Sequence, residues 1–195
     1  MNHRGGTGYG RAFQDMLNGQ WGVVDVEDAR TGAEHLVSAG LADPQRLVIM
    51  GGSAGGYTTL MALTQQPDFW AAGVSLFGVG DLYELKQGTH RFEVNYEQTL
   101  IGRLPEVGPL WKQRSPLTHV KNVRAPVLLF HGKDDKAVPH QQSVDFAEAV
   151  RRSGGVAELV SYEGEGHGFV NEATRRDMME KTERFLDKYV ICLQK

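Results

Sequence analysis

A serine surrounded by glycines is the strongest chemical signal in this sequence. Residues 48–60 read VIMGGSAGGYTTL, in which Gly51, Ser53 and Gly55 fill the pattern G-x-S-x-G. An apolar run precedes the serine and a helix-compatible stretch follows it, which is the context of a nucleophile on a sharp strand-to-helix turn. Such a turn crowds the positions two residues away, which explains the glycines there. It also directs the backbone N–H of Ala54 toward a developing oxyanion, so Ala54 is a candidate oxyanion donor.

Other interpretations of these glycines are weaker. Glycine-rich turns also bind phosphate, but no G-K-[S/T] follows this turn. Neither this turn nor the earlier stretch GGTGYG completes G-x-G-x-x-G, so a nucleotide site is not favoured. The remaining alternative is a small residue in a tight turn without chemical function.

A nucleophilic serine needs a base and an acid that orients the base, in the chain order Ser, Asp, His for this motif. The stretch LLFHGKDDKAVP places Asp134 and Asp135 just after an apolar run, and YEGEGHGF places His167 after another. An aspartate pair can also be turn chemistry or a helix cap, and a histidine between glycines can be an exposed loop residue. Together the three loops predict a catalytic triad of Ser53, one of the two aspartates, and His167.

The elements that position these residues alternate along the chain. Short apolar runs bounded by glycine or proline predict strands, and apolar residues at spacings of three and four predict helices. The predicted strands cover 47–50, 71–78, 126–130 and 157–162; the predicted helices cover 26–40, 54–66, 141–152 and 178–193. This alternation predicts an α/β fold with a parallel sheet and helices on both faces, with sites at the carboxyl ends of the strands. Residues 81–120, rich in charge and aromatic side chains, predict an irregular helical excursion.

Composition excludes several classes of protein. The 195 residues are 41% hydrophobic, which suits one domain, 1–195. The net charge is −3 with scattered lysines and arginines, so no nucleic-acid partner is expected. Cys192 is the single cysteine, which excludes an internal disulfide and fits a reducing compartment. The N-terminus does not resemble a signal peptide and no window approaches the ~20 apolar residues of a membrane span, so a cytoplasmic protein without a membrane partner is expected.

No metal or other cofactor is expected. The histidines other than His167 fit no compact metal-binding spacing, and we interpret them as surface, packing or hydrogen-bonding residues. They are His3, His35, His90, His119, His131 and His140.

Several blocks of the sequence together resemble the catalytic domain of the prolyl oligopeptidase family of serine peptidases, nearest its acylaminoacyl-peptidase and dipeptidyl-peptidase branch. The blocks are NHRGGTGYGRAF, WGVVDVEDA, ADPQRLVIMGGSAGGYTTL, DLYELKQGTHRFEVNY, RSPLTHVKNVRAPVLLFHGKDDKAVP and YEGEGHGF, and they cover almost the whole chain. The resemblance implies an α/β-hydrolase fold. It also implies Ser53 as nucleophile, Asp135 as orienting acid with Asp134 as its neighbour, His167 as general base, and the Ala54 N–H as oxyanion donor.

The resemblance implies a serine hydrolase that cleaves short peptides, acyl-peptides or simple esters, because these reactions share one acyl-enzyme. Two alternatives stay open. One is a catalytically weak fragment that acts as an interaction module or as half of a split enzyme. The other is a broad-specificity carboxylesterase with the same triad.

One departure from the family qualifies these expectations. Relatives carry a propeller and several sheet strands before the N-x-R-G-G-T-G-Y-G block, and this chain starts at that block. The loop that donates the second oxyanion hydrogen bond is expected to be missing, a contact worth roughly 10²–10³ in rate. The strand at 47–50 is expected to become a bare apolar edge, so we expect a homo-oligomer or a complementing N-terminal fragment.

Substrate specificity is less well determined by the sequence. Aromatic residues of the central region are candidates for an acyl pocket, although such residues more often pack in a core. Nearby charges are candidates for binding a peptide terminus, although solvent-exposed charges are the favoured interpretation. The aromatic candidates are Phe77, Tyr83, Phe92, Tyr96 and Trp111, and the charged ones are Arg91, Glu93 and Arg103.

Overall fold

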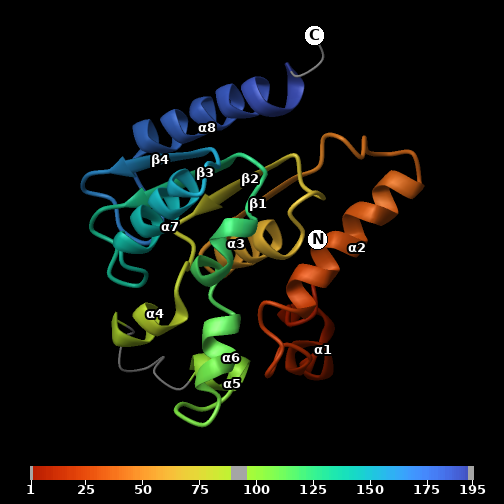
Figure 1. Ribbon diagram of the computed structural model, residues 1–195, viewed down its shortest axis with the longest axis vertical. Helices are drawn as coiled ribbons and strands as arrows, with labels where there is room; N and C mark the ends of the chain where they lie inside the picture. Colours follow the sequence, from red (N-terminus) through yellow and green to blue (C-terminus); the bar gives the residue numbers. More distant parts are fainter. Residues whose placement is uncertain (1, 89–95, 193–195) are drawn as a thin grey trace.

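Four parallel strands form the centre of the molecule. The computed structural model describes residues 2–88 and 96–192 (Figure 1). The strands are β1 (Val48–Gly52), β2 (Ala72–Leu76), β3 (Val127–Gly132) and β4 (Ala157–Tyr162), in the spatial order β1-β2-β3-β4. Every neighbouring pair is parallel. The predicted α/β fold with a parallel sheet is therefore confirmed, and its strands lie where the apolar runs placed them.

Helices cover both faces of this sheet, as predicted. One face packs against α2 (Val24–Ser38), α3 (Ala54–Gln65) and α7 (Gln141–Arg152), and the other packs against α8 (Glu172–Leu186). Figure 1 shows α8 on one side of the strands and α3 on the other. Alternation along the fully buried β3 divides the core, since Val127 and Leu129 join the first face and Leu128 and Phe130 join the second.

The last helix differs from its prediction, which was 178–193. It begins earlier, at Glu172, because the side chain of Asn171 accepts the backbone N–H of Ala173 and caps it. Its first turns are polar, so the apolar spacing that marks a helix starts only at Met178. After Leu186 the chain continues as the π-helical turn η3 (Asp187–Ile191).

Short helices fill the remaining segments. Before α2 lie η1 (Thr7–Tyr9) and α1 (Arg11–Asp15). Between β2 and β3 lie α4 (Leu82–Gly88), α5 (Tyr96–Ile101), α6 (Gly108–Gln113) and the 3₁₀ turn η2 (Pro116–Asn122). Buried side chains of this second group, among them Leu82, Leu100 and Trp111, belong to the same core cluster as α3 and α7.

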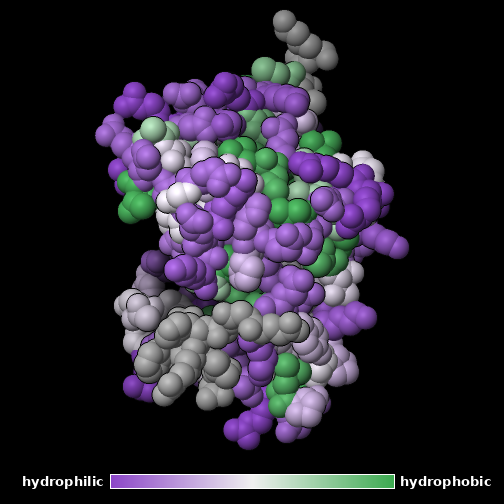
Figure 2. Space-filling view, turned by 90° about the vertical axis from the view of Figure 1, so that its left-hand side faces the viewer, coloured by the Kyte–Doolittle hydropathy of each residue, from purple (hydrophilic) through white to green (hydrophobic). Residues whose placement is uncertain are grey.

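The outer strand β4 has polar surroundings. The carboxylate of Glu158 lies 3.2 Å from Lys188 Nζ and accepts the Tyr189 hydroxyl, while the Tyr162 hydroxyl donates to Asp177 at 2.8 Å. Figure 2 views the molecule from the side on which β4 lies and shows mainly hydrophilic side chains over the upper half. Polar side chains of β4 are therefore paired with charged and hydroxyl groups of the C-terminal helices.

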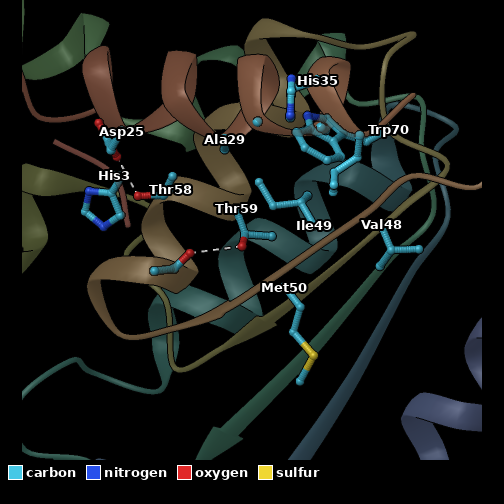
Figure 3. Close-up of a pocket in the computed structure, with 14 residues that line it drawn as sticks. His3, Asp25, Ala29, His35, Val48, Ile49, Met50, Thr58, Thr59 and Trp70 are labelled. Atoms are coloured by element: carbon cyan, nitrogen blue, oxygen red, sulfur yellow. Dashed lines mark hydrogen bonds between the residues drawn. The ribbon is translucent and has the colours of Figure 1, made fainter. Parts of the chain in front are cut away.

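The outer strand β1 has apolar surroundings. It pairs with β2, and its other edge faces no further strand among the described residues. Met50 on this edge is 51% exposed. A cavity of about 680 Å³ lies between α2 and β1, lined by residues that include Ile49 and Trp70 (Figure 3). A second cavity of about 480 Å³ lies between Met50 and α8.

In the described part of the chain, no helix has both the length and the hydropathy that crossing a membrane requires.

Candidate active site

Ser53 stands on a strained turn between β1 and α3. Its backbone has φ +54° and ψ −118°, a combination that costs a non-glycine residue about 1–3 kcal/mol. Hydrogen bonds on both sides hold this turn: the Ser53 N–H donates to Leu76 O, and the Ser53 carbonyl accepts the Tyr57 N–H, each at 2.9 Å. The sharp turn predicted from the glycine-rich pattern is therefore present.

The glycines around Ser53 are needed for different reasons. A Cβ at Gly51 would lie 2.4 Å from the backbone oxygen of Gly55, and a Cβ at Gly56 would lie 2.7 Å from Gly78 Cα. A Cβ at Gly55 itself would meet nothing within 4 Å. The expected crowding thus applies to Gly51, whereas Gly55 contributes the backbone that Gly51 closely approaches.

The structure brings together Ser53, His167 and Asp135 from loops after three different strands. His167 Nε2 lies 2.7 Å from Ser53 Oγ, and His167 Nδ1 lies 2.8 Å from Asp135 Oδ2. The loops meet because they follow the carboxyl ends of β1, β3 and β4, which lie at one end of a parallel sheet. Asp134 instead contributes its backbone N–H to Glu165 O, at 3.0 Å.

Asp135 is held by hydrogen bonds at both carboxylate oxygens. Oδ1 accepts the backbone N–H groups of Ala137 and Val138, each at 2.9 Å, while Oδ2 faces His167 and, at 3.2 Å, His131 Nε2. Burial alone would raise the pKa of this carboxyl group. The hydrogen bonds from His131, His167 and the two amides outweigh burial and hold the pKa well below its usual range. Asp135 is therefore ionised at neutral pH.

Glu165 holds the loop that carries His167. It is 2% exposed, and its carboxylate accepts the backbone N–H groups of Val170 and Asn171 at 2.9 and 3.0 Å. The same loop packs tightly on β3, because a Cβ at Gly132 would lie 2.2 Å from Glu165 O. Sequence reasoning missed Glu165, because its role depends on the conformation of the loop.

Comparison with known proteins gives this arrangement a family. A sequence profile described as the prolyl oligopeptidase family matches residues 1–191. The chain belongs to the prolyl oligopeptidase family. It is 31% identical over 191 residues to dipeptidyl aminopeptidase BIII of Pseudoxanthomonas mexicana, covering 95% of this chain and 28% of that protein. It is 28% identical to the acylamino-acid-releasing enzyme of Arabidopsis thaliana, covering 86% of this chain and 23% of that enzyme.

Solved structures give the same result. A puromycin-hydrolyzing peptidase of Mycobacterium tuberculosis superposes with a TM-score of 0.94 and 45% identity, covering 97% of this chain and 29% of that one. An acylaminoacyl peptidase of Pyrococcus horikoshii superposes with a TM-score of 0.88 and 28% identity, covering all of this chain and 32% of that one. The α/β-hydrolase fold is thereby established, and the chain spans less than a third of the length of these relatives.

An apolar cavity opens beside the serine of this prolyl oligopeptidase family chain. It measures about 370 Å³, and Ser53 and His167 both line it. Ala54, the first residue of α3 and the predicted oxyanion donor, lines it as well. The other lining residues are Leu17, Trp21, Val79, Leu85, Glu97, Leu100, Ala137 and Val138. A largely apolar cavity next to a nucleophile suits an apolar substrate group.

Three of the aromatic residues proposed for an acyl pocket are described by the structure, and none of them lines the cavity beside Ser53. Trp111 is fully buried in the core, and the Tyr83 hydroxyl donates to Gly108 O at 2.6 Å. Phe77, at φ +39°, packs its ring 4.8 Å from the His167 ring. The aromatic residue that does line the cavity, Trp21, was missed.

Of the charged candidates, Arg103 lies in the part of the chain that the structure describes. Arg103 is exposed and does not line the cavity beside Ser53. Arg91, Phe92, Glu93 and the side chain of Tyr96 lie outside what the structure describes, as does His90.

The remaining histidines make hydrogen bonds or line other surfaces. His3 Nδ1 donates to Arg4 O and His119 Nε2 donates to Gln113 O, while His35 lines the cavity beside β1. Among the described residues, no group of three or more His, Cys, Asp or Glu side chains is arranged to hold a metal ion. His131 contacts Asp135, and the His140 ring lies 5.5 Å from the His131 ring.

Proposed function

We propose that this chain carries the catalytic triad of a serine hydrolase, with Ser53 as nucleophile, His167 as general base and Asp135 as orienting acid. The observation that carries the proposal is the continuous pair of hydrogen bonds from Ser53 Oγ through the His167 ring to Asp135. Its order and directions are those that activate a serine hydroxyl. Membership of the prolyl oligopeptidase family supports it.

The geometry suits acyl transfer in two half-reactions. His167 Nε2 takes the proton of Ser53 as Oγ bonds to the substrate carbonyl carbon, and the carbonyl electron pair moves onto oxygen. The Ala54 N–H, at the positive end of α3, stabilises that oxyanion, and ionised Asp135 stabilises the imidazolium. The imidazolium then protonates the departing amine or alcohol. Water, deprotonated by His167, releases the acid and restores Ser53.

The substrate class follows from the site and its relatives. The cavity of about 370 Å³ beside Ser53 suits an apolar side chain on the acyl side of the cleaved bond. Named relatives include a dipeptidyl aminopeptidase and an acylamino-acid-releasing enzyme. We therefore propose short peptides, acyl-peptides and simple esters as substrates.

In a second candidate function, the chain is one part of a larger or split enzyme. The chain spans 28% of the dipeptidyl aminopeptidase it matches, so further polypeptide completes that enzyme. On this candidate, the Ala54 donor needs a second donor from outside the chain, and the chain alone acylates slowly without turnover. A broad-specificity carboxylesterase shares the triad and differs in its leaving group.

A fluorophosphonate probe tests the proposed nucleophile. The wild-type chain is expected to be labelled, and Ser53→Ala is expected to abolish labelling. Ser38→Ala is the matched control, because Ser38 is exposed at the end of α2 and bonds only locally to His35 O. Absence of wild-type labelling, or equal labelling of Ser53→Ala, contradicts the proposal.

Turnover then separates the candidate functions. Repeated hydrolysis of a p-nitrophenyl ester indicates a complete hydrolase, whereas a single slow acylation indicates a part of a larger enzyme. Faster turnover of an aminoacyl anilide than of the ester favours a peptidase over a carboxylesterase.

We also propose that further polypeptide covers the free edge of β1. For the 195-residue chain on its own, that polypeptide is a second copy, because an unpaired apolar edge recruits another strand. In a longer protein the same edge accepts a strand from the additional chain. The cytoplasmic location, expected from composition, stays a prediction.

A further inference from the structure

A second buried imidazole contacts the carboxylate of Asp135. His131, the penultimate residue of β3, has no exposed surface. Its Nε2 lies 3.2 Å from Asp135 Oδ2, the oxygen that also lies 2.8 Å from His167 Nδ1. One carboxylate oxygen therefore serves two imidazoles, one facing the serine and one facing the protein interior.

The partners of His131 fix which nitrogen carries its proton. Nε2 donates to the backbone oxygen of Val138 at 3.0 Å, and Asp135 Oδ2, at 3.2 Å, is a second acceptor beside the same N–H. Nδ1 lies 2.7 Å from the hydroxyl oxygen of Ser143 in α7, and a hydroxyl can donate to it. A neutral ring with its proton on Nε2 therefore satisfies both nitrogens.

We propose that His131 is a positioning residue, whose Nε2–H, shared with Val138 O, helps to hold Oδ2 of Asp135 in the place where it meets His167. The amides of Ala137 and Val138 hold Oδ1, so donors at both oxygens prevent rotation of the carboxylate. Ser143 in turn fixes the His131 ring from α7. The catalytic consequence rests on the proposed function, while the assignment of the proton on His131 does not.

Other titratable groups lie close to His131. The His140 ring meets it edge-on at 5.5 Å, and burial together with the charge of Lys133 lowers the pKa of His140, which favours its neutral form. Lys133 pairs with Glu163 at the surface. Asp135 is thus the buried charge that His131 contacts directly.

Substitution of His131 tests its effect on the triad. His131→Leu removes the donor and is expected to slow fluorophosphonate labelling about 10- to 100-fold, the equivalent of one hydrogen bond to a charged group. The acidic limb of the labelling rate is expected to move to higher pH, because a carboxylate with one donor fewer attracts the His167 proton more strongly. His131→Gln places an amide N–H near the original Nε2 and is expected to restore most of the rate and the original limb.

A milder variant covers the case in which His131→Leu does not fold. Ser143→Ala keeps the imidazole and frees its ring, so a smaller loss of about 3- to 10-fold is expected, the equivalent of one neutral hydrogen bond. Ser153→Ala, at the exposed end of the same helix, is the matched control and should leave the rate unchanged. Rates and acidic limbs equal to wild type in both His131→Leu and Ser143→Ala overturn the proposal.

A measurement without catalysis separates this inference from the proposed function. In ¹⁵N-histidine NMR spectra, with His131 assigned by its loss in His131→Gln, Nε2 is expected to be protonated. An unprotonated Nε2 overturns the positioning role, whether or not the enzyme is active. Failure of the wild-type chain to react with the probe contradicts the triad instead, and leaves the NMR result to decide the assignment of His131.

Discussion

The two outer strands of the sheet meet their surroundings in opposite ways. On β4, charged and hydroxyl groups such as Glu158 and Tyr162 have partners in the C-terminal helices. On β1, the residues are Val, Ile, Met and two glycines, and Met50 lines two cavities whose walls are mainly apolar. The edge strand of a sheet usually carries charged residues that prevent further pairing. Because β1 carries none, its composition is that of an interior strand.

Both strands nevertheless lead into the same site. Ser53 follows directly after β1, the loop after β4 carries His167, and the loop after the central strand β3 supplies Asp135. The contacts that orient these side chains lie at the carboxyl ends of the strands and not along the free edge. Changes at the strand ends should therefore alter the chemistry of the site, whereas changes at the β1 edge should alter association with other polypeptides.

Among the residues that support Ser53, Asp135 is expected to show the largest effect. Asp135→Asn keeps the shape of the side chain but removes the charge that orients His167, so the labelling rate should fall about 10⁴-fold. The measurement is the second-order rate of labelling by a fluorophosphonate at neutral pH. A loss of less than tenfold would show that the Asp135–His167 contact does not orient the base.

The difference in unfolding free energy between wild type and Asp135→Asn should depend on pH. Because the folded protein holds the pKa of Asp135 below its unfolded value, the ionised group contributes stability above about pH 4, and this contribution is lost as the pH falls further. Wild type should therefore exceed Asp135→Asn by about 2 kcal/mol in unfolding free energy at pH 7 and by less at pH 3. Urea unfolding at the two pH values measures this, and an unchanged difference contradicts the assignment.

A smaller effect is expected at the turn that carries Ser53. Gly51→Ala would bring Cβ to 2.4 Å from Gly55 O, and since both are backbone-fixed the turn must shift. We expect about 3 kcal/mol of destabilisation and a labelling rate about 100-fold lower, because Ser53 Oγ moves away from His167. Gly55→Ala is the matched control from the same motif.

That control has open space for its Cβ and lies in a helix, where alanine is favoured over glycine by about 1 kcal/mol. Its labelling should stay near wild type and its thermal midpoint should not fall. If both glycine variants lose labelling equally, the crowding at Gly51 does not explain the motif.

The residues of this site differ in how far sequence could predict them. That Ser53 and His167 come together was predictable, because a short motif and the order of loops after strands suffice. The residues alone left Asp134 and Asp135 both open, and the preference for Asp135 came from the family resemblance. In the structure it is the turn to Ala137 and Val138 that brings Asp135 to the histidine.

Two supporting residues were beyond prediction from local patterns. His131 lies at the end of β3, and its local sequence indicates only a strand residue. Its role was not visible there because its partner Ser143 is twelve positions away on α7. Glu165 acts on the backbone of the residues that follow His167, which requires the loop conformation to be known. The fold itself was more accessible, since glycine and proline bound each buried strand.

The smallest effect on chemistry is expected at the free edge of β1. If a second copy pairs with this edge, the isolated chain should associate at micromolar concentration. Met50→Lys should weaken this association at least about tenfold, because it places a charge between two mainly apolar cavities.

Leu41→Lys is the control, because Leu41 is 75% exposed and lines neither cavity. Sedimentation velocity measures association, and labelling should stay within about twofold of wild type in both variants, since neither side chain contacts the triad. A wild-type chain that stays monomeric, or equal weakening by the two lysines, would mean that β1 is not the site of pairing.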